Sequence, residues 1–539
     1  MKNKNYPLYE VEPISNLKEL INHIAEKYGD NPAFTFERKK EIVNISYCQF
    51  KADVDALGTA LFDLGIRNAK VAVIGENSYE WILTYFAIVN SGNVIVPLDK
   101  ELPAADIRNL VDHSEAEVFV YSYTYSDITD YLRENCIGIK HFINMNSLPE
   151  LTKKGNLLIQ QGEESVVNFE VDNYALTALL YTSGTTGNAK GVMLTHYGIA
   201  GDAIAACQFV NVIESNLLVL PLHHTLGMVA ICTMLVKKSE IYINSSLKNI
   251  LHDLKKYRPS NIFLVPLFVE TFYKQIWENA KSQNKDNLLR KMITFSNALR
   301  KTGIDIRRLL FKSVLNAFGG NLSLIICGGA PLDTKYIHGF RDIGIDMLIA
   351  YGITECSPAV SINRNRYHRD GSVGLVLNCY EVKIVEPDEN GYGEIYVKGD
   401  TLMLGYYKNE QTTIDAFDGD WFKTGDIGYL DRDGFLYLCG RKKNVIILNN
   451  GENVYPEELE FALANQIPYI KEVVVYAEDN LIVAEAFLDT ESFPDCASLL
   501  GDDIVELNRT LPPYKNVGKT VIRDKEFPKT TTKKIKRQY

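Results

Sequence analysis

Short apolar segments alternate with helix-like segments through the first 440 residues of the chain. Residues 54–64 have the pattern of an amphipathic helix, and a second helix is expected at 80–90. The apolar runs that read as buried strands are 71–74, 94–97, 262–265 and 322–327. This alternation is typical of α/β proteins with largely parallel sheets. The sequence therefore predicts a large α/β domain of stacked, mostly parallel sheets, with a charged helical excursion at 281–315.

The pattern of predicted helices and strands changes twice toward the C-terminus. From about Glu381 short strands are separated by turn residues, which predicts a small β-barrel-like lobe. After Arg441 a strand, a helix opening near Pro456 and further strands form a compact α+β pattern. We therefore expect an N-terminal core over residues 1–442 and a smaller, mobile C-terminal domain over 443–539.

Charge and cysteine content exclude several classes of protein. A formal net charge of -11 argues against a general binder of nucleic acid or of anionic membranes, although the tail at 529–537 is basic. Nine cysteines are scattered singly, a pattern typical of reduced thiols in a cytoplasmic protein. No apolar run is long enough to span a membrane, so a transmembrane segment is not expected.

One loop concentrates chemistry that suits phosphate. Residues 181–191 read Tyr-Thr-Ser-Gly-Thr-Thr-Gly-Asn-Ala-Lys-Gly, with four Ser/Thr hydroxyls, three glycines and one lysine. Glycines let backbone N–H groups converge on an anion, while hydroxyls and lysine add donors and positive charge. An apolar run precedes the loop and a helix-like segment follows it, so we expect strand, loop and helix in that order. Ala189 and Gly191 stand where a Walker A motif needs Gly and Ser/Thr, which disfavours an ordinary P-loop NTPase.

Further clusters fit the same ligand. The sequence Tyr351-Gly352-Ile353-Thr354-Glu355 offers an aromatic face for a purine, a hydroxyl for a phosphate and a carboxylate for Mg²⁺. Asp426, fifteen residues before Arg441, could accept hydrogen bonds from a ribose diol. A lysine in the C-terminal run 528–537 could neutralise charge that develops on a carboxylate and a phosphate.

Together these motifs resemble the adenylate-forming superfamily of acyl-CoA synthetases, peptide-synthetase adenylation domains and firefly luciferase. The resemblance covers about residues 16–537, nearest the fatty acyl-CoA branch. The motifs occur in the family's order: the loop at 181–187, Pro-x-x-His at 221–224, Gly-Gly-Ala-Pro at 328–331, Tyr-Gly-x-Thr-Glu at 351–355, Thr-Gly-Asp at 424–426, Gly-Arg at 440–441 and the C-terminal lysine.

The resemblance implies a role for each matched residue. The β- and γ-phosphates of ATP are expected at Thr182, Ser183, Thr185, Thr186 and Lys190. Adenine is expected at Gly329, Ala330, Pro331 and Tyr351, and ribose at Asp426 and Arg441. Thr354 would meet the α-phosphate and Glu355 would hold Mg²⁺. Lys534 matches the catalytic lysine, and His224 the histidine between the carboxylate site and the thiol channel. Lys443 falls at the hinge, and Asn450 and Gly451 fall on the strand that serves the thiol step.

Two positions depart from the family pattern. The usual Thr-Gly-Lys of the C-terminal motif reads Thr532-Lys533-Lys534, so a lysine replaces the glycine beside the catalytic position. Ala350 stands before Tyr351 where fatty acyl-CoA synthetases usually have glycine. The added methyl group could shorten or redirect the channel for a fatty acid.

The implied activity is ATP-dependent conversion of a carboxylic acid, expected to be a fatty acid, to an acyl-adenylate with release of pyrophosphate. Transfer to the thiol of CoA would then give an acyl-CoA. The alternative is an acyl- or aryl-acid ligase that loads the phosphopantetheine of an acyl carrier protein. A non-catalytic nucleotide-binding protein and a luciferase-like oxygenase are less favoured classes. Amino-acid adenylation is not expected, because residues 220–228 contain no aspartate to pair an α-ammonium group.

Overall fold

The computed structural model describes residues 4–182, 189–212, 214–244, 246–448, 452–478, 481–529 and 535–537. The described chain divides into two compact units. The first contains residues 1–381 and 398–417, and the second contains residues 382–397 and 418–539. The predicted boundary at residue 442 stays a prediction.

A seven-stranded sheet forms one layer of the first unit. Its strands in spatial order are β18 (Gly405–Tyr406), β8 (Lys190–Thr195), β7 (Leu176–Thr182), β4 (Val94–Pro97), β3 (Lys70–Ile74), β5 (Val118–Tyr121) and β6 (His141–Asn144). The strands from β7 to β6 are parallel, while β8 is antiparallel to both β7 and β18. The predicted strands at 71–74 and 94–97 are confirmed as β3 and β4.

A second sheet in the same unit is also mostly parallel. Its strands in order are β2 (Glu41–Ser46), β1 (Pro32–Arg38), β10 (Glu240–Ile243), β9 (Ser215–Leu218), β11 (Asn261–Leu264), β12 (Leu324–Cys327), β13 (Asp346–Gly352), β14 (Ala359–Ile362) and β15 (Gly374–Val376). The strands from β1 to β13 run parallel, and β2, β14 and β15 are antiparallel additions.

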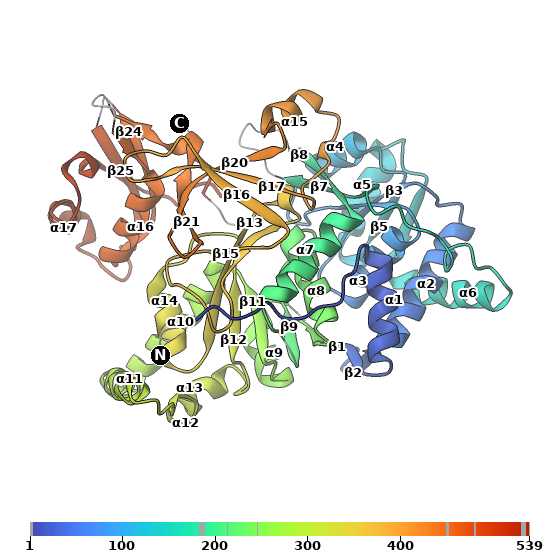
Figure 1. The fold of residues 1–539 in the computed structure, drawn as a ribbon, viewed down its shortest axis with the longest axis horizontal. Coiled ribbons are helices and arrows are strands. Elements are labelled where there is room, and N and C mark those ends of the chain that lie inside the picture. Colours follow the sequence, from blue (N-terminus) through green and yellow to red (C-terminus); the bar gives the residue numbers. More distant parts are fainter. Residues whose placement is uncertain are drawn as a thin grey trace. The chain divides into compact units, whose positions relative to one another are not determined.

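Two helices lie between these sheets (Figure 1). Helix α7 (His196–Phe209) contacts β8 of one sheet and β14 of the other, and α8 (Thr225–Val236) packs beside it. Almost every residue of both helices is buried. A helix covered on all sides must be apolar on all sides, which explains why neither segment shows an amphipathic pattern.

Further helices of this unit pack around the two sheets. Helix α3 (Tyr79–Asn90) is almost entirely buried and contacts β4. The other helices of the N-terminal part are α1 (Leu17–Tyr28), α2 (Tyr47–Asp63), α4 (Ala104–Ser114), α5 (Ser126–Asn135) and α6 (Leu148–Gln160). The second sheet shares a core with α9 (Ile250–Tyr257), α10 (Pro266–Ser282), α11 (Asp286–Lys301), α13 (Lys312–Ala317) and α14 (Thr334–Asp342). Two short helices are α12 (Arg307–Leu310) and α15 (Glu410–Ala416). The predicted helical excursion at 281–315 is confirmed as α11 to α13, at the lower edge of this unit in Figure 1.

The second unit begins with an antiparallel run of strands. These are β16 (Tyr380–Val385), β17 (Gly393–Gly399), β20 (Trp421–Leu430) and β21 (Phe435–Arg441), with the short β19 (Phe417–Asp418) beside β20. Among the described strands β16 has a neighbour on one side only, so the run is open and forms no closed barrel. The predicted strands are therefore present, in an open rather than a closed arrangement.

The end of the chain forms the predicted α+β pattern. Strands β24 (Ile470–Glu478), β25 (Leu481–Leu488) and β26 (Val517–Arg523) make a three-stranded sheet, and β22 (Ile446–Ile447) pairs with β23 (Asn453–Val454). Helices α16 (Pro456–Gln466) and α17 (Cys496–Asn508) share an apolar core with them. Pro456 begins α16 and Glu457 and Glu458 occupy its first turn, where a fixed φ and negative charge favour a helix start.

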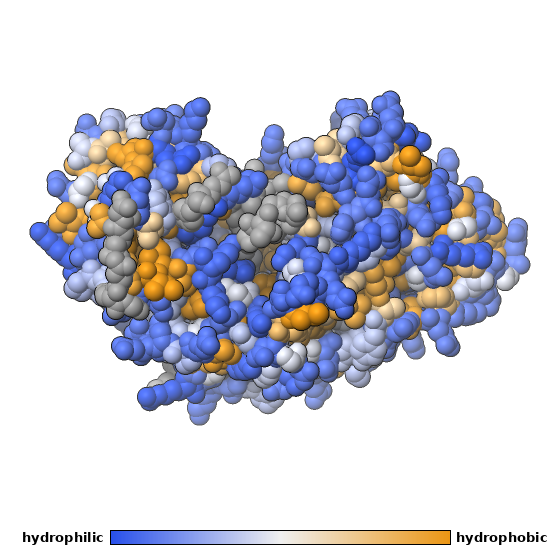
Figure 2. Space-filling model, turned by 90° about the horizontal axis from the view of Figure 1, so that it is seen from above, coloured by the Kyte–Doolittle hydropathy of each residue, from blue (hydrophilic) through white to orange (hydrophobic). Residues whose placement is uncertain are grey.

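No helix in the described part of the chain is both long and apolar enough to cross a bilayer. All nine cysteines are free thiols, and all but two are buried. Figure 2 shows one face of the molecule, on which hydrophilic residues predominate and hydrophobic residues form separate patches.

Candidate active site

The predicted phosphate loop is closed by a β-hairpin. Thr182 ends β7 and Lys190 begins β8, and the two residues are paired across the hairpin. Ser183, Thr185 and Thr186, which lie between them, are outside the described residues. The expected order of strand, loop and helix is wrong, because strand β8 precedes helix α7. Residues 191–194 are apolar and pair with β7 on one side, and β8 pairs with β18 on the other, which makes a strand the favoured structure there.

Tyr406 connects this hairpin to Glu355. The Nζ atom of Lys190 lies 5.0 Å from the centroid of the Tyr406 ring, within the range of a cation–π contact. The Tyr406 hydroxyl donates a hydrogen bond of 2.8 Å to Oε1 of Glu355. Burial and, next, the Glu355 carboxylate raise the pKa of Tyr406 well above its ordinary value, so the hydroxyl stays a donor. Among the described residues no donor reaches Oε2 of Glu355.

The turn that carries Glu355 is fixed from several sides. It follows β13 as the 3-10 turn Thr354–Cys356, and its backbone accepts a hydrogen bond of 2.8 Å from Met403 N–H. The Ser357 hydroxyl donates to the carbonyl of Thr401 at 2.7 Å. A Cβ atom at Gly352 would lie 2.0 Å from the carbonyl oxygen of Pro358, so only glycine lets the chain return this closely. The carboxylate therefore stands on a rigid support.

A buried carboxyl group holds the other side of this turn. Asp202 on α7 is completely buried, and its Oδ2 accepts a hydrogen bond of 3.2 Å from Ala359 N–H. Its Oδ1 has no hydrogen-bond partner among the described residues. Burial raises the pKa of Asp202 well above its ordinary value, which favours the neutral acid over the carboxylate.

His224 lies at the start of α8, close to the same turn. It is the residue before Thr225, whose hydroxyl lies 3.4 Å from the hydroxyl of Thr354. The rings of His223 and His224 are in contact, with centroids 4.1 Å apart. Burial, and then His224, lower the pKa of His223 to about 3, so His223 is neutral near neutral pH.

Asn77 orders the loop that leads to these histidines. Its Nδ2 donates to the carbonyl of Leu220 at 2.8 Å, and its Oδ1 accepts from Leu222 N–H at 3.2 Å. A Cβ atom at Gly227 would approach the carbonyl oxygen of Pro221 to 2.4 Å. Glycine in the first turn of α8 therefore lets the helix pack directly against the Pro-x-x-His loop.

The predicted adenine residues lie at the ends of adjacent parallel strands. Gly329, Ala330 and Pro331 follow β12, and Tyr351 lies near the end of the neighbouring β13. Ligands of open parallel sheets bind at such carboxyl ends. Gly329 has a φ of +88°, and a Cβ atom there would have no neighbour closer than 3.8 Å. The backbone at Gly329 is therefore accessible to a ligand, and the next residues, Ala330 and Pro331, are exposed. Tyr351 is buried.

Asp426 and Arg441 pair with each other in the second unit. They are opposite residues of β20 and β21, and Arg441 Nε lies 2.7 Å from Asp426 Oδ1. The Thr424 hydroxyl accepts a hydrogen bond from Asp426 N–H at 3.0 Å and donates to the carbonyl of Ile395 at 2.7 Å. The two residues predicted for the ribose are thus adjacent and rigidly supported.

The remaining predicted residues are Lys443, Asn450, Gly451 and Lys534. Lys443 lies in the 3-10 turn Lys442–Asn444 that follows β21, and burial, then Arg441 and Arg537, lower the pKa of its ammonium group. Asn450, Gly451 and Lys534 are outside the described residues.

The described residues of the first unit bring together Thr182, Lys190, Thr354, Glu355 and His224, with Gly329 and Tyr351 at the ends of neighbouring strands. Four residues that position these side chains through hydrogen bonds were not indicated by sequence patterns. They are Asn77, Asp202, Thr225 and Tyr406. Tyr406 lies 51 residues from Glu355, and its neighbours contain no motif that would single it out.

Comparison with known protein families shows which family the chain belongs to. The model of the AMP-binding enzyme family matches residues 21–407, and that of the AMP-binding enzyme C-terminal domain matches residues 443–539. The chain belongs to the AMP-binding enzyme family. This is the adenylate-forming superfamily that the motifs predicted.

Curated relatives of this AMP-binding enzyme are fatty-acid ligases by name. The long-chain-fatty-acid–CoA ligase FadD15 of Mycobacterium bovis is 29% identical over 465 residues, which cover 82% of this chain and 76% of the relative. The long-chain-fatty-acid–CoA ligase 5 of Rattus norvegicus is 27% identical over 545 residues, which cover 93% of this chain and 79% of the relative.

Solved structures share the fold. The anthranilate CoA ligase AuaEII in complex with anthranoyl-AMP has a TM-score of 0.77 at 20% identity, covering 99% of this chain and 97% of that one. The o-succinylbenzoate CoA synthetase of Bacillus subtilis with ATP and a magnesium ion has a TM-score of 0.72 at 22% identity, covering 96% of this chain and 98% of that one. These likenesses confirm the predicted α/β architecture with a large N-terminal and a smaller C-terminal domain.

Replacing Asp202 with Asn should remove a pH dependence of stability. The unfolded chain releases this proton above the ordinary Asp pKa of 3.8, whereas the folded protein keeps it up to the raised value. Asp202 therefore makes the wild type less stable as pH rises through that window, by up to about 1.4 kcal/mol per pH unit. Asp202→Asn lacks this loss, so its stability relative to wild type, measured by urea unfolding, should improve as pH rises above the ordinary Asp pKa of 3.8. Exposed Asp127→Asn is the control, and a difference that does not change with pH for Asp202→Asn would contradict the assignment.

Proposed function

We propose that this AMP-binding enzyme is an AMP-forming acid–thiol ligase that converts a fatty acid, ATP and CoA into an acyl-CoA, AMP and pyrophosphate. The observation that carries the proposal is the link from the hairpin ends, through Tyr406, to Glu355. It sets the Lys190 ammonium group, paired across the hairpin with Thr182, near the Glu355 carboxylate, which suits a nucleotide polyphosphate with its cation. The names of the curated relatives support a fatty acid as the acid and CoA as the thiol.

The residues at the two ends of the hairpin and the turn that carries Glu355 fit ATP and Mg²⁺. Thr182 and Lys190, with Ser183, Thr185 and Thr186 between them, would surround the β- and γ-phosphates. Glu355 would hold Mg²⁺ through Oε2, because Tyr406 already occupies Oε1. Mg²⁺ at a nucleotide is typically held by phosphate oxygens, water and one or two carboxylates, so a single Glu is sufficient. The bound cation would neutralise charge on the phosphates.

The nucleoside would occupy two further groups of residues. Gly329, Ala330 and Pro331 would line adenine through open backbone, with Tyr351 stacked on the base. Asp426 would accept hydrogen bonds from the ribose hydroxyls, with Arg441 orienting its carboxylate at 2.7 Å. Thr354, whose hydroxyl lies beside that of Thr225, would donate to the α-phosphate.

The reaction then has two displacements. A carboxylate oxygen of the substrate forms a bond to the α-phosphorus, and the bond from that phosphorus to the bridging oxygen breaks, so pyrophosphate leaves with the electron pair. The CoA thiolate next attacks the acyl carbon, and AMP leaves. No protein nucleophile is needed, so positioning and charge neutralisation provide the catalysis. We assign Lys534 to neutralising the first transition state, with Lys533 beside it as a second cation. We assign Lys443 to the hinge between the steps, and Asn450 and Gly451 to the thiol step.

The surroundings of α8 favour an apolar acid. An apolar cavity of about 10 Å³ lies beside Thr225 and is lined by Tyr85, Pro97, Leu180, Ile199, Thr225, Met228 and Val229. Its lining contains no charged group that could pair an α-ammonium group. An acyl chain that extends from the Thr354–His224 region into this space must displace side chains such as Met228, which is flexible enough to move.

We propose CoA as the acceptor thiol and the cytoplasm as the compartment. CoA is favoured over a carrier protein, because the curated relatives are named CoA ligases. Nine free cysteines suit a reducing compartment, so we assign the reaction to the cytoplasm.

A substrate screen tests the function. Purified protein with MgATP should release pyrophosphate with medium- and long-chain fatty acids, and addition of CoA should give AMP and the acyl-CoA in equal amounts. Amino acids should support less than about 1% of that rate, because burying an unpaired ammonium group costs several kcal/mol. Release of ADP and phosphate, or acid-dependent pyrophosphate release with amino acids only, would refute the proposal.

Replacing Tyr406 with Phe should slow adenylate formation about 10- to 100-fold, because a hydrogen bond to a charged group contributes about 1.5–3 kcal/mol. The ring that contacts Lys190 would remain. ATP–pyrophosphate exchange at varied Mg²⁺ measures the loss, which we expect to be accompanied by a higher Mg²⁺ requirement. Tyr407→Phe is a matched control, because the Tyr407 hydroxyl also donates to a carboxylate at 2.8 Å, but to exposed Glu115. Equal effects of the two substitutions would remove Tyr406 from the cation site.

A further inference from the structure

The helical excursion carries a strong local positive charge. Residues 281–312 contain nine Lys or Arg side chains and two Asp side chains, a net charge of +7 in a chain whose net charge is -11. The overall charge argues against general binding to anionic surfaces, so any such binding must be confined to a face of this kind.

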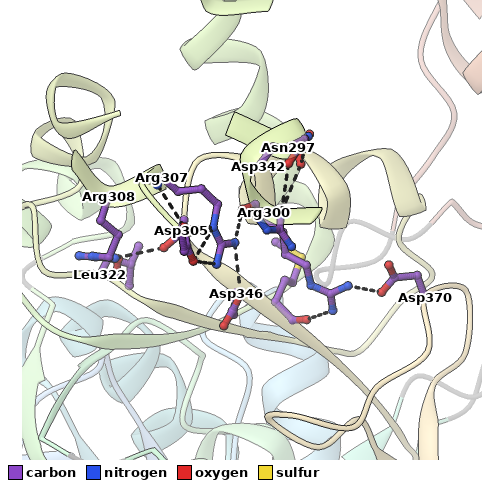
Figure 3. Close-up of polar contacts among 12 residues, drawn as sticks. Asn297, Arg300, Asp305, Arg307, Arg308, Leu322, Asp342, Asp346 and Asp370 are labelled. Carbon is purple, nitrogen blue, oxygen red and sulfur yellow. Dashed lines mark hydrogen bonds and ion pairs between the residues drawn. The ribbon is translucent and has the colours of Figure 1, made fainter. Parts of the chain in front are cut away.

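The arginines of this segment are used internally. Arg307 pairs with Asp305 at 2.7 Å and donates to the carbonyl of Arg341 at 2.6 Å. Arg308 donates to the carbonyls of Leu322 and Gly320 at 2.9 and 2.8 Å, and Arg300 lies 4.0 Å from Asp342. Figure 3 shows these side chains pointing toward the adjoining loops and Asp346. They attach α11 and α12 to the ends of β12 and α14.

The lysines point away from these contacts. Lys281, Lys291, Lys301 and Lys312 are exposed, and none forms an ion pair with a described residue. Three nearby carboxylates are already engaged: Asp342 accepts from Asn297 at 2.9 Å, Glu278 lies 3.7 Å from Lys274, and Asp346 lies 3.9 Å from Arg307. The positive charge of the lysines is therefore directed to solvent.

Large apolar side chains are exposed among these lysines. Leu288 and Phe295 on α11 are 54% and 57% exposed, and their spacing of seven residues places them on one face of the helix. Ile304, which follows α11, is 53% exposed, and Leu309 on α12 is 77% exposed. The adjacent side of α11, with Leu289 and Ser296, is buried. The excursion thus combines a fixed inner side with an outer side of lysines and separate apolar groups.

We propose that α11, the turn after it and α12 form a docking face for the surface of an anionic lipid bilayer. Lysine ammonium groups would lie among the headgroups while Leu288, Phe295, Ile304 and Leu309 enter the acyl boundary, as in interfacial amphipathic helices. A nucleic acid backbone offers no apolar surface that the exposed leucine and phenylalanine side chains could contact. A folded protein partner would favour a contiguous apolar patch over separate side chains. A bilayer accepts separate insertions. A bilayer also suits the proposed function, because fatty acids partition into bilayers. This one point rests on the proposed function.

Vesicle co-sedimentation tests the proposal with the full-length protein. Wild type should bind vesicles of phosphatidylcholine mixed with phosphatidylglycerol, bind phosphatidylcholine alone far more weakly, and dissociate as salt is raised. The triple variant Lys291→Glu, Lys301→Glu, Lys312→Glu should weaken binding at least about 100-fold, since each lysine near an anionic surface contributes roughly fivefold. The double variant Leu288→Ser, Phe295→Ser should weaken it at least about 10-fold.

A charge-matched control separates the face from overall charge. Lys39→Glu, Lys153→Glu, Lys248→Glu changes three exposed lysines outside the excursion and should retain affinity within about threefold. Equal loss in both triple variants, equal binding to neutral vesicles, or full affinity in the Leu288/Phe295 variant would overturn the proposal. Pyrophosphate release from dissolved acid should be unchanged in the excursion variants. Absence of that release in wild type would refute the proposed function while leaving the binding comparison valid.

Discussion

The proposed nucleotide site depends on one contact, the position of Tyr406 between the Lys190 ammonium group and the Glu355 carboxylate. It joins the end of a β-hairpin in one sheet to a turn that follows a strand of the other sheet. In the proposed site, this contact fixes the distance between the groups that would bind a polyphosphate and its cation. Because β18 is hydrogen-bonded to β8, the tyrosine is positioned by the same hairpin that carries the lysine.

The layered fold makes this contact possible. Helices α7 and α8 lie between the two sheets, and each approaches the site closely because a small residue allows it. Gly227 lets α8 pack on Pro221, and a Cβ atom at Gly198 of α7 would lie only 2.8 Å from the Ser357 hydroxyl. Asp202 then holds the strand after the Glu355 turn at the cost of burying a carboxyl group. Burying that group favours its neutral form, so the site rests on a polar contact whose strength depends on pH.

Strands with distinctive composition were predictable, and contacts between distant segments were not. The run at 94–97 coincides with β4 because three consecutive β-branched residues before a proline favour a strand over a helix. Asp426 and Arg441 were paired by motif, and their register across β20 and β21 confirms that they are neighbours. The hairpin at residues 182–190 was misread because the pairing of β8 with β18 depends on residues more than 200 positions later. Tyr406, Asn77 and Asp202 form side-chain hydrogen bonds with residues 51, 143 and 157 positions away, and local patterns do not encode such contacts.

Transfer of an oxygen isotope from the acid tests the central claim, that a substrate carboxylate attacks the α-phosphorus, most directly. Fatty acid labelled with ¹⁸O in its carboxylate is turned over with MgATP and CoA, and the products are analysed by mass spectrometry. The account predicts that AMP carries one labelled oxygen from the acid and that pyrophosphate carries none. Label in inorganic phosphate, or unlabelled AMP formed together with acyl-CoA, would contradict it.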